Sequence, residues 1–395
     1  MQAGRGIRAL AVLDGFYTLG GLERQTLAVL RCLLEAGARV ECLLNYLRPE
    51  PIAEALDALG ATWTVGHHRS PLRRPRRPGQ LLGMTQDLAR TNGTLLRVAA
   101  RLRPTHVFLP QDRCALRAMP ALLRLRRMGI RSIMRLGNAP EPGRTHRLLW
   151  RQGIDRVVDR YVCNSRFIRR ELLAHGVAEA KTGVVYNAVT RSVCSPLPDP
   201  QPGRVVFLGQ VIPSKGLHHL IEAVGILRRD GVPVSLDVVG DMDGWTTPAY
   251  RAYRSELRNR VGGDPQLRDC VRFLGWQDEV LPYLARASVH CLPSLEGQRE
   301  GLAGAVLEAK LAGRPSVVTR SGALPELVEH GVDGWICSDF SPGSLAAGLA
   351  RFLRDEGACT RAGEAARASL SVRFGQERFR SRWLEEFGAA LGRDS

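Results

Sequence analysis

The chain has 395 residues, a formal net charge of +17, a hydrophobic fraction of 44% and a charged fraction of 24%. This length predicts two domains, and the composition is typical of a soluble globular protein. No apolar run reaches the ~18 residues of a membrane-spanning helix, and the run 7–13 leads to no cleavage site, which argues against a signal peptide. Nine scattered cysteines without a Cys-x-x-Cys pair favour free, buried thiols in a cytosolic protein over a structural zinc.

Short apolar runs and helical patterns alternate along the whole chain. Strand-like runs in the first half lie at 7–13, 39–44, 62–65, 106–109, 131–135, 160–163 and 183–186. After the proline-rich connection 195–203 the alternation restarts, with runs at 205–208, 235–239, 271–273, 288–292 and 316–319, and three helical stretches close the chain. The pattern predicts an α/β protein with two doubly wound parallel sheets, whose ligands bind beyond the carboxyl ends of the strands.

The segment E-G-L-A-G-A-V-L-E, from Glu300 to Glu308, carries the strongest functional signal. Gly301, Ala303 and Gly304 leave the entry to the following helix bare, so its first backbone N–H groups could meet a phosphate. If all helical, the segment spans ~12 Å, beyond the ~5 to 9.5 Å between glycosidase carboxylates. A nucleotide-sugar fits, with the hexose near Glu300 and the ribose near Glu308. Solvated end carboxylates on a closely packed helix remain the alternative.

A second loop of phosphate-binding type follows the run 205–208. The sequence G-Q-V-I-P-S-K-G at 209–216 leads into a helical pattern that begins near Ser214. Lys215 would lie at the start of this helix, where a cation is unfavourable for the macrodipole unless an anion shares the site. The position of this lysine therefore predicts an anion beside it.

Several further motifs occur in a recognisable order. They are G-G-L-E-R at 20–24, V-C-N-S at 162–165, V-V-Y-N-A-V at 184–189, V-V-G-D at 238–241 and S-G-A-L-P-E-L-V at 321–328. Together with 209–216 and 300–308, they resemble the retaining GT-B glycosyltransferases of family 4 over nearly the whole chain. The resemblance implies an N-terminal Rossmann-like acceptor domain (1–195), a C-terminal donor domain (203–370) facing it across a cleft, and a last helix (371–395) that packs back toward the N-terminal domain.

The resemblance also implies roles for individual residues around a nucleotide-sugar. Lys215 would bind the donor diphosphate, Glu300 the transferred sugar and Glu308 the ribose hydroxyls. Further donor contacts would come from Gly20, Gly21, Gly209, Gln210, Gly301, Leu302 and Ala303. Gln210 stands where the family usually has an arginine, so donor phosphate affinity would depend more on Lys215 and on backbone N–H groups.

The acceptor side departs from the family in lacking a histidine after the fourth strand. Asp112 is the candidate there for orienting or deprotonating an acceptor hydroxyl, although an aspartate at this place also caps helices. Arg135 and Asn138, after the next strand, are further acceptor-side candidates. In this family the leaving phosphate can itself take the acceptor's proton, so a missing histidine is compatible with turnover, with Lys215 stabilising the departing nucleotide.

We expect no metal and no cofactor besides the nucleotide-sugar. The D-x-D sequence Asp241-Met242-Asp243 follows a strand and Gly240, where the resembled family needs no metal. The pairs His67-His68 and His218-His219 lack a third ligand at metal spacing, which favours ordinary packing roles.

The positive charge predicts an anionic partner. Basic residues concentrate at 67–77, including Arg73, Arg74, Arg76 and Arg77, and again at 124–131. These segments are either solvated loops or a surface that holds the protein against anionic lipid at the inner face of the cytoplasmic membrane. We expect no specific nucleic acid, because recognition motifs and aromatic platforms are lacking.

The sequence thus predicts a retaining hexosyltransferase that acts on an envelope polysaccharide, lipopolysaccharide or lipid-linked glycan with a UDP- or GDP-sugar as donor. A nucleotide-sugar epimerase or hydrolase of the same fold, and an idle basic scaffold that binds glycan or nucleic acid, are the alternatives.

Overall fold

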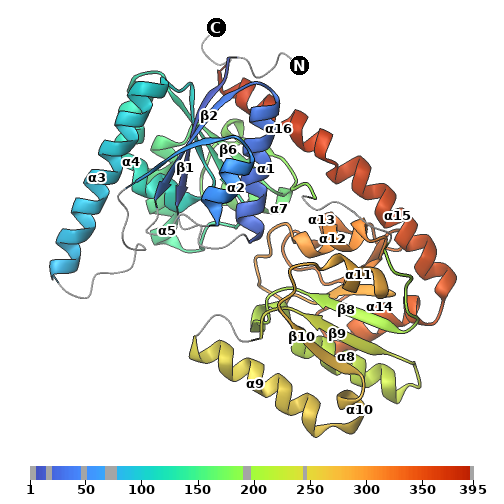
Figure 1. The fold of residues 1–395 in the computed structure, drawn as a ribbon. Coiled ribbons are helices and arrows are strands. Elements are labelled where there is room, and N and C mark those ends of the chain that lie inside the picture. The colour runs from blue at the N-terminus through green and yellow to red at the C-terminus, as the bar shows by residue number, and fades with distance from the viewer. Residues whose placement is uncertain are drawn as a thin grey trace. The chain divides into compact units, whose positions relative to one another are not determined.

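The computed structural model describes residues 6–14, 20–45, 51–66, 78–189, 197–242 and 247–391. The chain forms two compact units (Figure 1): unit 1 contains Met1–Thr190 and Glu377–Ser395, and unit 2 contains Arg191–Gln376. The chain passes back from unit 2 to unit 1 at Glu377 and not at the expected residue 371. The reason is that helix α15 (Glu356–Phe374) continues through residue 371 and ends before Gly375, whose backbone is extended. The last segment of the chain therefore returns to unit 1.

Unit 1 contains, in its described part, a seven-stranded parallel sheet with the order β3-β2-β1-β4-β5-β6-β7. Its strands are β1 (Arg8–Asp14), β2 (Arg39–Asn45), β3 (Thr62–Val65), β4 (His106–Leu109), β5 (Arg131–Leu136), β6 (Arg160–Cys163) and β7 (Thr182–Val184). Its helices are α1 (Gly21–Glu35), α2 (Ile52–Ala58), α3 (Pro78–Leu102), α4 (Asp112–Arg127), α5 (Arg144–Leu149), α6 (Asp155–Val157), α7 (Arg166–Ala174) and α16 (Gln376–Leu391).

Both faces of this sheet are covered by helices. Along β1, alternate side chains point to opposite faces, so that Ala9 and Leu13 enter one core while Leu10 and Val12 enter the other. Helices α1, α2 and α16 pack on the first face, and α3, α4, α6 and α7 pack on the second. Both faces being buried explains why the strands read as continuous apolar runs.

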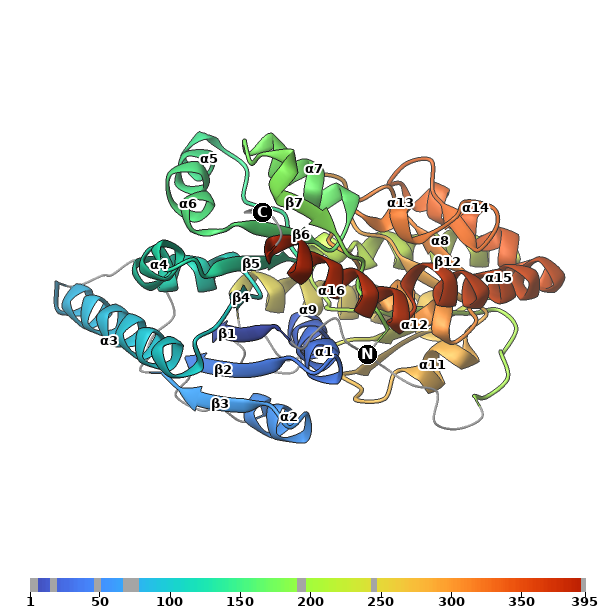
Figure 2. The ribbon, with the colours of Figure 1, turned by 90° about the horizontal axis from the view of Figure 1, so that it is seen from above.

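Helix α16 belongs to the core of unit 1. Phe379, Trp383 and Phe387 recur at intervals of four residues and form one buried stripe. The centroid of the Phe108 ring of β4 lies 5.7 Å from the ring centroid of Trp383 and 6.1 Å from that of Phe387. Figures 1 and 2 both place α16 beside α1. The packing of this last helix on unit 1 follows from its aromatic stripe.

Unit 2 contains, within the described ranges, a six-stranded parallel sheet with the order β10-β9-β8-β11-β12-β13. Its strands are β8 (Arg204–Leu208), β9 (Ser235–Val239), β10 (Val271–Gly275), β11 (Val289–Leu292), β12 (Ser316–Val318) and β13 (Gly334–Ile336). Its helices are α8 (Leu217–Arg229), α9 (Pro248–Gly263), α10 (Pro265–Arg268), α11 (Leu281–Arg286), α12 (Gly304–Leu311), α13 (Leu324–Leu327), α14 (Pro342–Leu353) and α15. Sequence patterning missed β13, because this strand begins with a glycine and contains only two apolar side chains.

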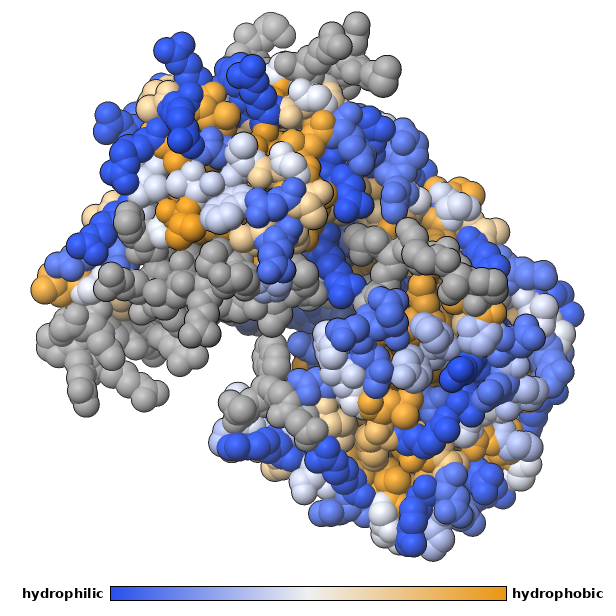
Figure 3. Space-filling view, in the orientation of Figure 1, coloured by the Kyte–Doolittle hydropathy of each residue, from blue (hydrophilic) through white to orange (hydrophobic). Residues whose placement is uncertain are grey.

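The surface is mixed in character. On the face that Figure 3 presents, hydrophilic side chains predominate and hydrophobic ones gather in small groups. Across the described residues, every helix is too short or too polar to cross a membrane. The eight described cysteines are all buried, and they form no disulfide with one another.

Candidate functional site

The strand order of unit 2 reverses between β8 and β11. The chain passes from β8 outward through β9 and β10, then returns to add β11, β12 and β13 on the other side. In open parallel sheets, the crevice beyond the strand ends at such a reversal is where ligands bind. Lys215 lies in the loop after β8, and Glu300 lies in the loop after β11. The two leading candidates of the sequence thus lie together beyond the strand ends at this reversal.

Lys215 ends a single 3-10 turn, Pro213–Lys215, that precedes α8. Helix α8 begins at Leu217 and not near Ser214, because Gly216 has a left-handed backbone (φ +68°) that interrupts the helical pattern. A Cβ on Gly216 would lie 2.1 Å from the carbonyl oxygen of Pro293. Glycine at this position therefore lets the loop after β8 contact the loop after β11.

The side chains of Lys215 and Glu300 form an ion pair. Lys215 Nζ lies 2.6 Å from Glu300 Oε2, and Ser294 Oγ donates to the same oxygen at 3.3 Å. The two side chains remain 18% and 15% exposed, so solvent reaches the pair. The anion expected beside Lys215 is Glu300 itself. Ser294 was missed by sequence reasoning, although a serine just past the end of a buried strand is a signal for such a site.

The main chain of Glu300 is held by the loop after β12. Ala323 N–H donates to the Glu300 carbonyl at 2.9 Å. Gly322 has φ +55°, and a Cβ there would lie 2.1 Å from the Glu300 carbonyl oxygen. Ser321 Oγ donates to the Gln298 carbonyl at 2.9 Å. The S-G pair of the motif 321–328 therefore positions the Glu300 loop, a role that the sequence did not assign.

Helix α12 begins at Gly304, four positions after Glu300. The segment between the two glutamates is therefore not all helical, and the ~12 Å estimate for a continuous helix does not apply. Ala303 is the N-cap and gives no side-chain cap, which leaves first-turn N–H groups for an anion. Leu302 and Ala303 are buried, Gly301 and Glu308 are half-buried, and Glu308 already has an interaction partner.

A buried ion pair joins α12 to Asp333, the residue before β13. Lys310 Nζ lies 2.5 Å from Asp333 Oδ2 and 3.0 Å from the Ser369 hydroxyl of α15. Both charged side chains are only 1% exposed. Burial lowers the pKa of Lys310, and the neighbouring Asp333 carboxylate opposes that shift. This pair fixes the helix whose N-terminus adjoins Glu300.

The loops after β8 and β9 pack against each other. Gly209 N–H donates to the Val239 carbonyl at 3.0 Å, and a Cβ on Gly240 would lie 2.0 Å from the Gly209 carbonyl oxygen. Gln210 is exposed, and Asp241 is half-buried with an interaction partner. Both glycines are thus explained by this close backbone packing.

Of the sequence features considered for metal binding, only some lie among the described residues. Asp243 and the pair His67-His68 lie outside the described residues. His218 Nδ1 lies 3.0 Å from the Tyr253 hydroxyl, and His219 Nδ1 lies 2.8 Å from the Phe340 carbonyl oxygen. Three His, Cys, Asp or Glu side chains arranged for a metal ion do not occur among the described residues.

In unit 1, Gly20 and Gly21 lie at the start of α1. Gly20 is the N-cap, and a Cβ there would lie 2.9 Å from Glu23 Oε2. The Glu23 carboxylate is hydrogen-bonded by the backbone N–H groups of Gly20 and Glu23, while burial raises the pKa of this carboxyl. A Cβ on Gly21 would meet no described atom within 4 Å. The N-terminus of α1 therefore already has an anionic partner, as in a capping box.

The acceptor-side candidates differ in exposure. Asp112 begins α4, and its Oδ1 accepts the N–H of Arg113 at 2.8 Å. Arg135 is buried at the end of β5, where burial lowers the pKa of its guanidinium to about 10 and Glu23 opposes this shift. Arg135 Nη2 donates to Asn187 Oδ1 at 2.8 Å, whereas Asn138 is exposed. Arg135 thus joins β5 to the segment after β7.

Of the two basic segments, 67–77 and 124–131, only the second lies among the described residues. Arg73, Arg74, Arg76 and Arg77 lie outside the described residues. In the second segment, Arg126 and Arg131 form ion pairs with Asp159 at 3.2 and 4.0 Å. Arg124 and Arg127 are exposed in the last turn of α4, where cations are favourable for the helix macrodipole.

Comparison with known proteins agrees with this architecture. The model described as Glycosyltransferase Family 4 matches residues 19–193, and the model described as Glycosyl transferases group 1 matches residues 202–355. The amylovoran biosynthesis glycosyltransferase AmsK of Erwinia amylovora is 33% identical over 181 residues, which cover 45% of this chain and 42% of AmsK. The lipopolysaccharide core biosynthesis glycosyltransferase LpsE of Rhizobium meliloti is 29% identical over 181 residues, 46% of this chain and 48% of LpsE.

These sequence matches span less than half the length of either curated relative. Among solved structures, HepE of Anabaena in complex with UDP superposes with a TM-score of 0.77 at 18% identity, covering 97% of this chain and 100% of HepE. At this identity the likeness concerns the fold. The prediction of two doubly wound, Rossmann-like domains of the GT-B class is confirmed.

Proposed function

Because the chain belongs to glycosyltransferase family 4, we propose that it transfers a hexose from a UDP- or GDP-linked sugar, with retention of configuration, to an envelope polysaccharide, lipopolysaccharide or lipid-linked glycan. The observation that carries this proposal is the Lys215–Glu300 pair at the strand reversal of unit 2. The named functions of AmsK and LpsE, and the UDP bound to HepE, support the class of donor and acceptor.

The pair suits stabilisation of a departing nucleoside diphosphate. The ammonium of Lys215 has three N–H donors, so it can keep Glu300 and still donate to a phosphate oxygen. As the bond between the anomeric carbon and the phosphate oxygen breaks, negative charge develops where Lys215 and the N-terminus of α12 stabilise it. The acceptor oxygen forms the new bond to the same carbon, and its proton passes to the departing phosphate.

In this scheme Glu300 positions the sugar, and Glu308 holds the ribose. Ser294 and Gly322 keep Glu300 in place through the contacts described above. We propose that the reaction needs no metal ion, since Lys215 and backbone N–H groups supply the positive charge at the diphosphate. Asp112 and Asn138 remain the proposed acceptor contacts, while the bond from Arg135 to Asn187 favours a positioning role for that arginine.

We further propose that the protein works at the inner face of the cytoplasmic membrane. Basic residues near an anionic membrane contribute ~1 kcal/mol each, and Arg73, Arg74, Arg76 and Arg77 with Arg124 and Arg127 supply such charge. Sedimentation with anionic vesicles, reversed by salt, is the expected behaviour. Equal sedimentation with neutral vesicles would contradict this attachment.

The test of the proposed reaction measures nucleoside diphosphate release from UDP-, GDP- and ADP-sugars, with chelator present, for the parent and for Lys215→Ala. We expect release from one donor and its loss in the variant. Release that is unaffected by added glycan acceptors would instead indicate a hydrolase. If the panel gives no release and calorimetry detects no donor binding, the protein is a scaffold and the proposal is wrong.

A further inference from the structure

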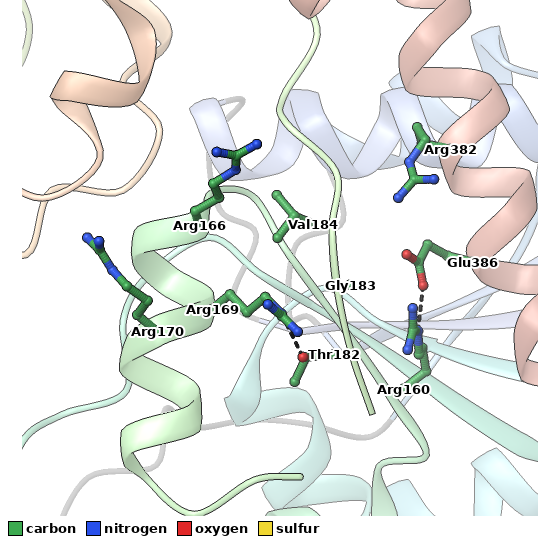
Figure 4. A pocket seen from close by; sticks show the side chains of 9 residues that line it. All are labelled: Arg160, Arg166, Arg169, Arg170, Thr182, Gly183, Val184, Arg382 and Glu386. Atoms are coloured by element: carbon green, nitrogen blue, oxygen red, sulfur yellow. Dashed lines mark hydrogen bonds and ion pairs between the residues drawn. The ribbon is translucent and has the colours of Figure 1, made fainter. Parts of the chain in front are cut away.

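A groove of about 500 Å³ lies along β7 in unit 1 (Figure 4). Strand β7 is the edge strand of its sheet and forms the floor. The walls carry five arginines and one glutamate, namely Arg160, Arg166, Arg169, Arg170, Arg382 and Glu386. All of them belong to unit 1. None takes part in the proposed transfer reaction.

The groove exists because two helix layers flank the edge of the sheet. Helix α7 packs on one face through Ile168 and Leu172, and α16 packs on the opposite face through Phe387. Figure 4 shows the two helices on either side of β7. A Cβ on Gly183 would lie 2.1 Å from Glu386 Oε1. Glycine in the floor therefore lets the Glu386 carboxylate lie against the strand.

Two of the guanidinium groups are held in fixed orientations. Arg160 Nε donates to Glu386 at 2.5 Å, and its Nη1 donates to the Ala180 carbonyl at 2.9 Å. Arg169 Nε donates to the Thr182 hydroxyl at 2.9 Å, and its Nη2 donates to Glu179 at 2.7 Å. A guanidinium carries five N–H donors, so these bonds orient each group and leave donors for a ligand.

The three arginines of α7 lie at the end of the helix where the macrodipole disfavours cations. Arg166, Arg169 and Arg170 lie in the first five residues of α7, whose first turn contains no acidic residue. Cations at a helix N-terminus are unfavourable for the macrodipole. Arg382 approaches from the other wall, where Glu385 is its ion partner at 2.5 Å. An anion in the groove would offset the repulsion among these groups.

We propose that the groove binds a phosphate ester or diphosphate. Planar guanidinium groups match phosphate oxygens in paired hydrogen bonds, and arginines from three elements surround the space from several directions. A diphosphate presents enough oxygens to engage both walls at once. Two sources carry this chemistry, a soluble phosphate ester and the phosphate headgroup of a membrane lipid. The inference does not depend on the transfer reaction.

The test is calorimetric titration of the full chain with inorganic pyrophosphate in the Lys215→Ala background, which keeps the donor site from contributing. Arg166→Gln/Arg382→Gln removes one cation from each wall and leaves Arg160 and Arg169 intact. Arg144→Gln/Arg147→Gln is the matched control, since both arginines are exposed on α5 of the same unit. Thermal unfolding establishes that both double variants are folded.

We expect the groove variant to bind pyrophosphate about tenfold more weakly or worse, because one charge-assisted hydrogen bond is worth at least that factor. The control should stay close to the parent. No binding by the parent, or equal weakening in both double variants, would overturn the proposal.

Sedimentation with vesicles of neutral lipid containing phosphatidic acid distinguishes the two sources. For a lipid headgroup, the groove variant sediments less than the control, and pyrophosphate releases the parent from the vesicles. For a soluble phosphate ester, pyrophosphate binds in the titration while both double variants sediment alike.

Discussion

Unit 2 contains two lysine–carboxylate pairs of similar length and different surroundings. Lys215 and Glu300 lie 2.6 Å apart with side chains that are 18% and 15% exposed. Lys310 and Asp333 lie 2.5 Å apart, and each is 1% exposed. Lys215 belongs to the loop after β8, which the sequence marks as functional, and Lys310 lies two residues after Glu308.

The difference in burial separates a ligand site from an anchor. A ligand can compete for the partly exposed pair of Lys215 and Glu300, because water already reaches both charges. The buried pair cannot be separated without leaving a charge in a dry interior, which is strongly unfavourable. The sequence proposed a role for Lys215 and none for Lys310, and the difference in exposure now assigns a structural role to Lys310.

The largest expected effect comes from breaking the buried pair. Lys310→Met leaves Asp333 as an uncompensated buried carboxylate, so we expect the free energy of unfolding to fall by roughly 3–5 kcal/mol. Chemical denaturation of the full chain measures this loss. Lys215→Met is the matched control and should lose no more than about 1 kcal/mol, as partly exposed pairs do. Similar losses for the two variants would remove the distinction between the pairs.

The partly exposed pair of Lys215 and Glu300 should show the opposite behaviour, with a large loss of activity and little loss of stability. Glu300→Gln keeps the shape of the side chain and removes the charge beside Lys215. We expect nucleoside diphosphate release to fall roughly 10²-fold, the loss that follows when a reacting group is no longer held in position. The melting temperature should change little. Turnover equal to the parent would exclude a catalytic role for Glu300.

Gly322 tests whether the Glu300 loop must be positioned by its neighbour. Gly322→Ala places a methyl group 2.1 Å from the Glu300 carbonyl oxygen, and a displacement of about 1 Å at a reacting group can cost ~10²-fold in rate. Gly331→Ala is the control, because Gly331 also has positive φ (+79°) and no described atom within 4 Å of the added Cβ. Both variants should lose ~1–2 kcal/mol from backbone strain, and Gly322→Ala should lose more because the added methyl group also clashes with the Glu300 backbone. Only Gly322→Ala should lose turnover.

The smallest effect concerns a buried titratable group without an ion partner. His290 of β11 is fully buried, its Nδ1 lies 3.1 Å from the Ser316 hydroxyl, and burial lowers its pKa to about 3. The unfolded chain takes up this proton near pH 6.5, whereas the folded chain takes it up only near pH 3. The contribution of His290 to the free energy of unfolding is therefore full above pH 6.5 and falls as the pH decreases, by up to ~1.4 kcal/mol per pH unit.

His290→Gln keeps a hydrogen-bonding group beside Ser316 and cannot titrate. Between pH 7.5 and 5, the free energy of unfolding of the parent should therefore fall more steeply with decreasing pH than that of the variant. Curves that stay parallel would show that His290 does not contribute to the acid sensitivity.

Much of the fold could be predicted from the sequence. Strands β3, β4, β6 and β9 match their predicted ranges, because each is a short apolar run between clear turn or helix signals. Prediction was less accurate where a glycine changed the backbone. Gly216 moved the start of α8, and Gly375 separated α15 from α16. Neither conformation can be read from residue type alone, since glycine also occurs inside α3 and α14.

The sequence by itself determined the alternation of strands and helices, the reversal of strand order that follows from it, and the identities of Lys215 and Glu300 as candidates. These depend on neighbouring residues, whose spacing sets periodicity and loop chemistry. Tertiary structure alone decided that Glu300 is the anion beside Lys215, that Gly322 holds the Glu300 loop, and that arginines from three elements line one groove. Such contacts join residues far apart in the chain, and their distances and burial exist only once both partners are folded.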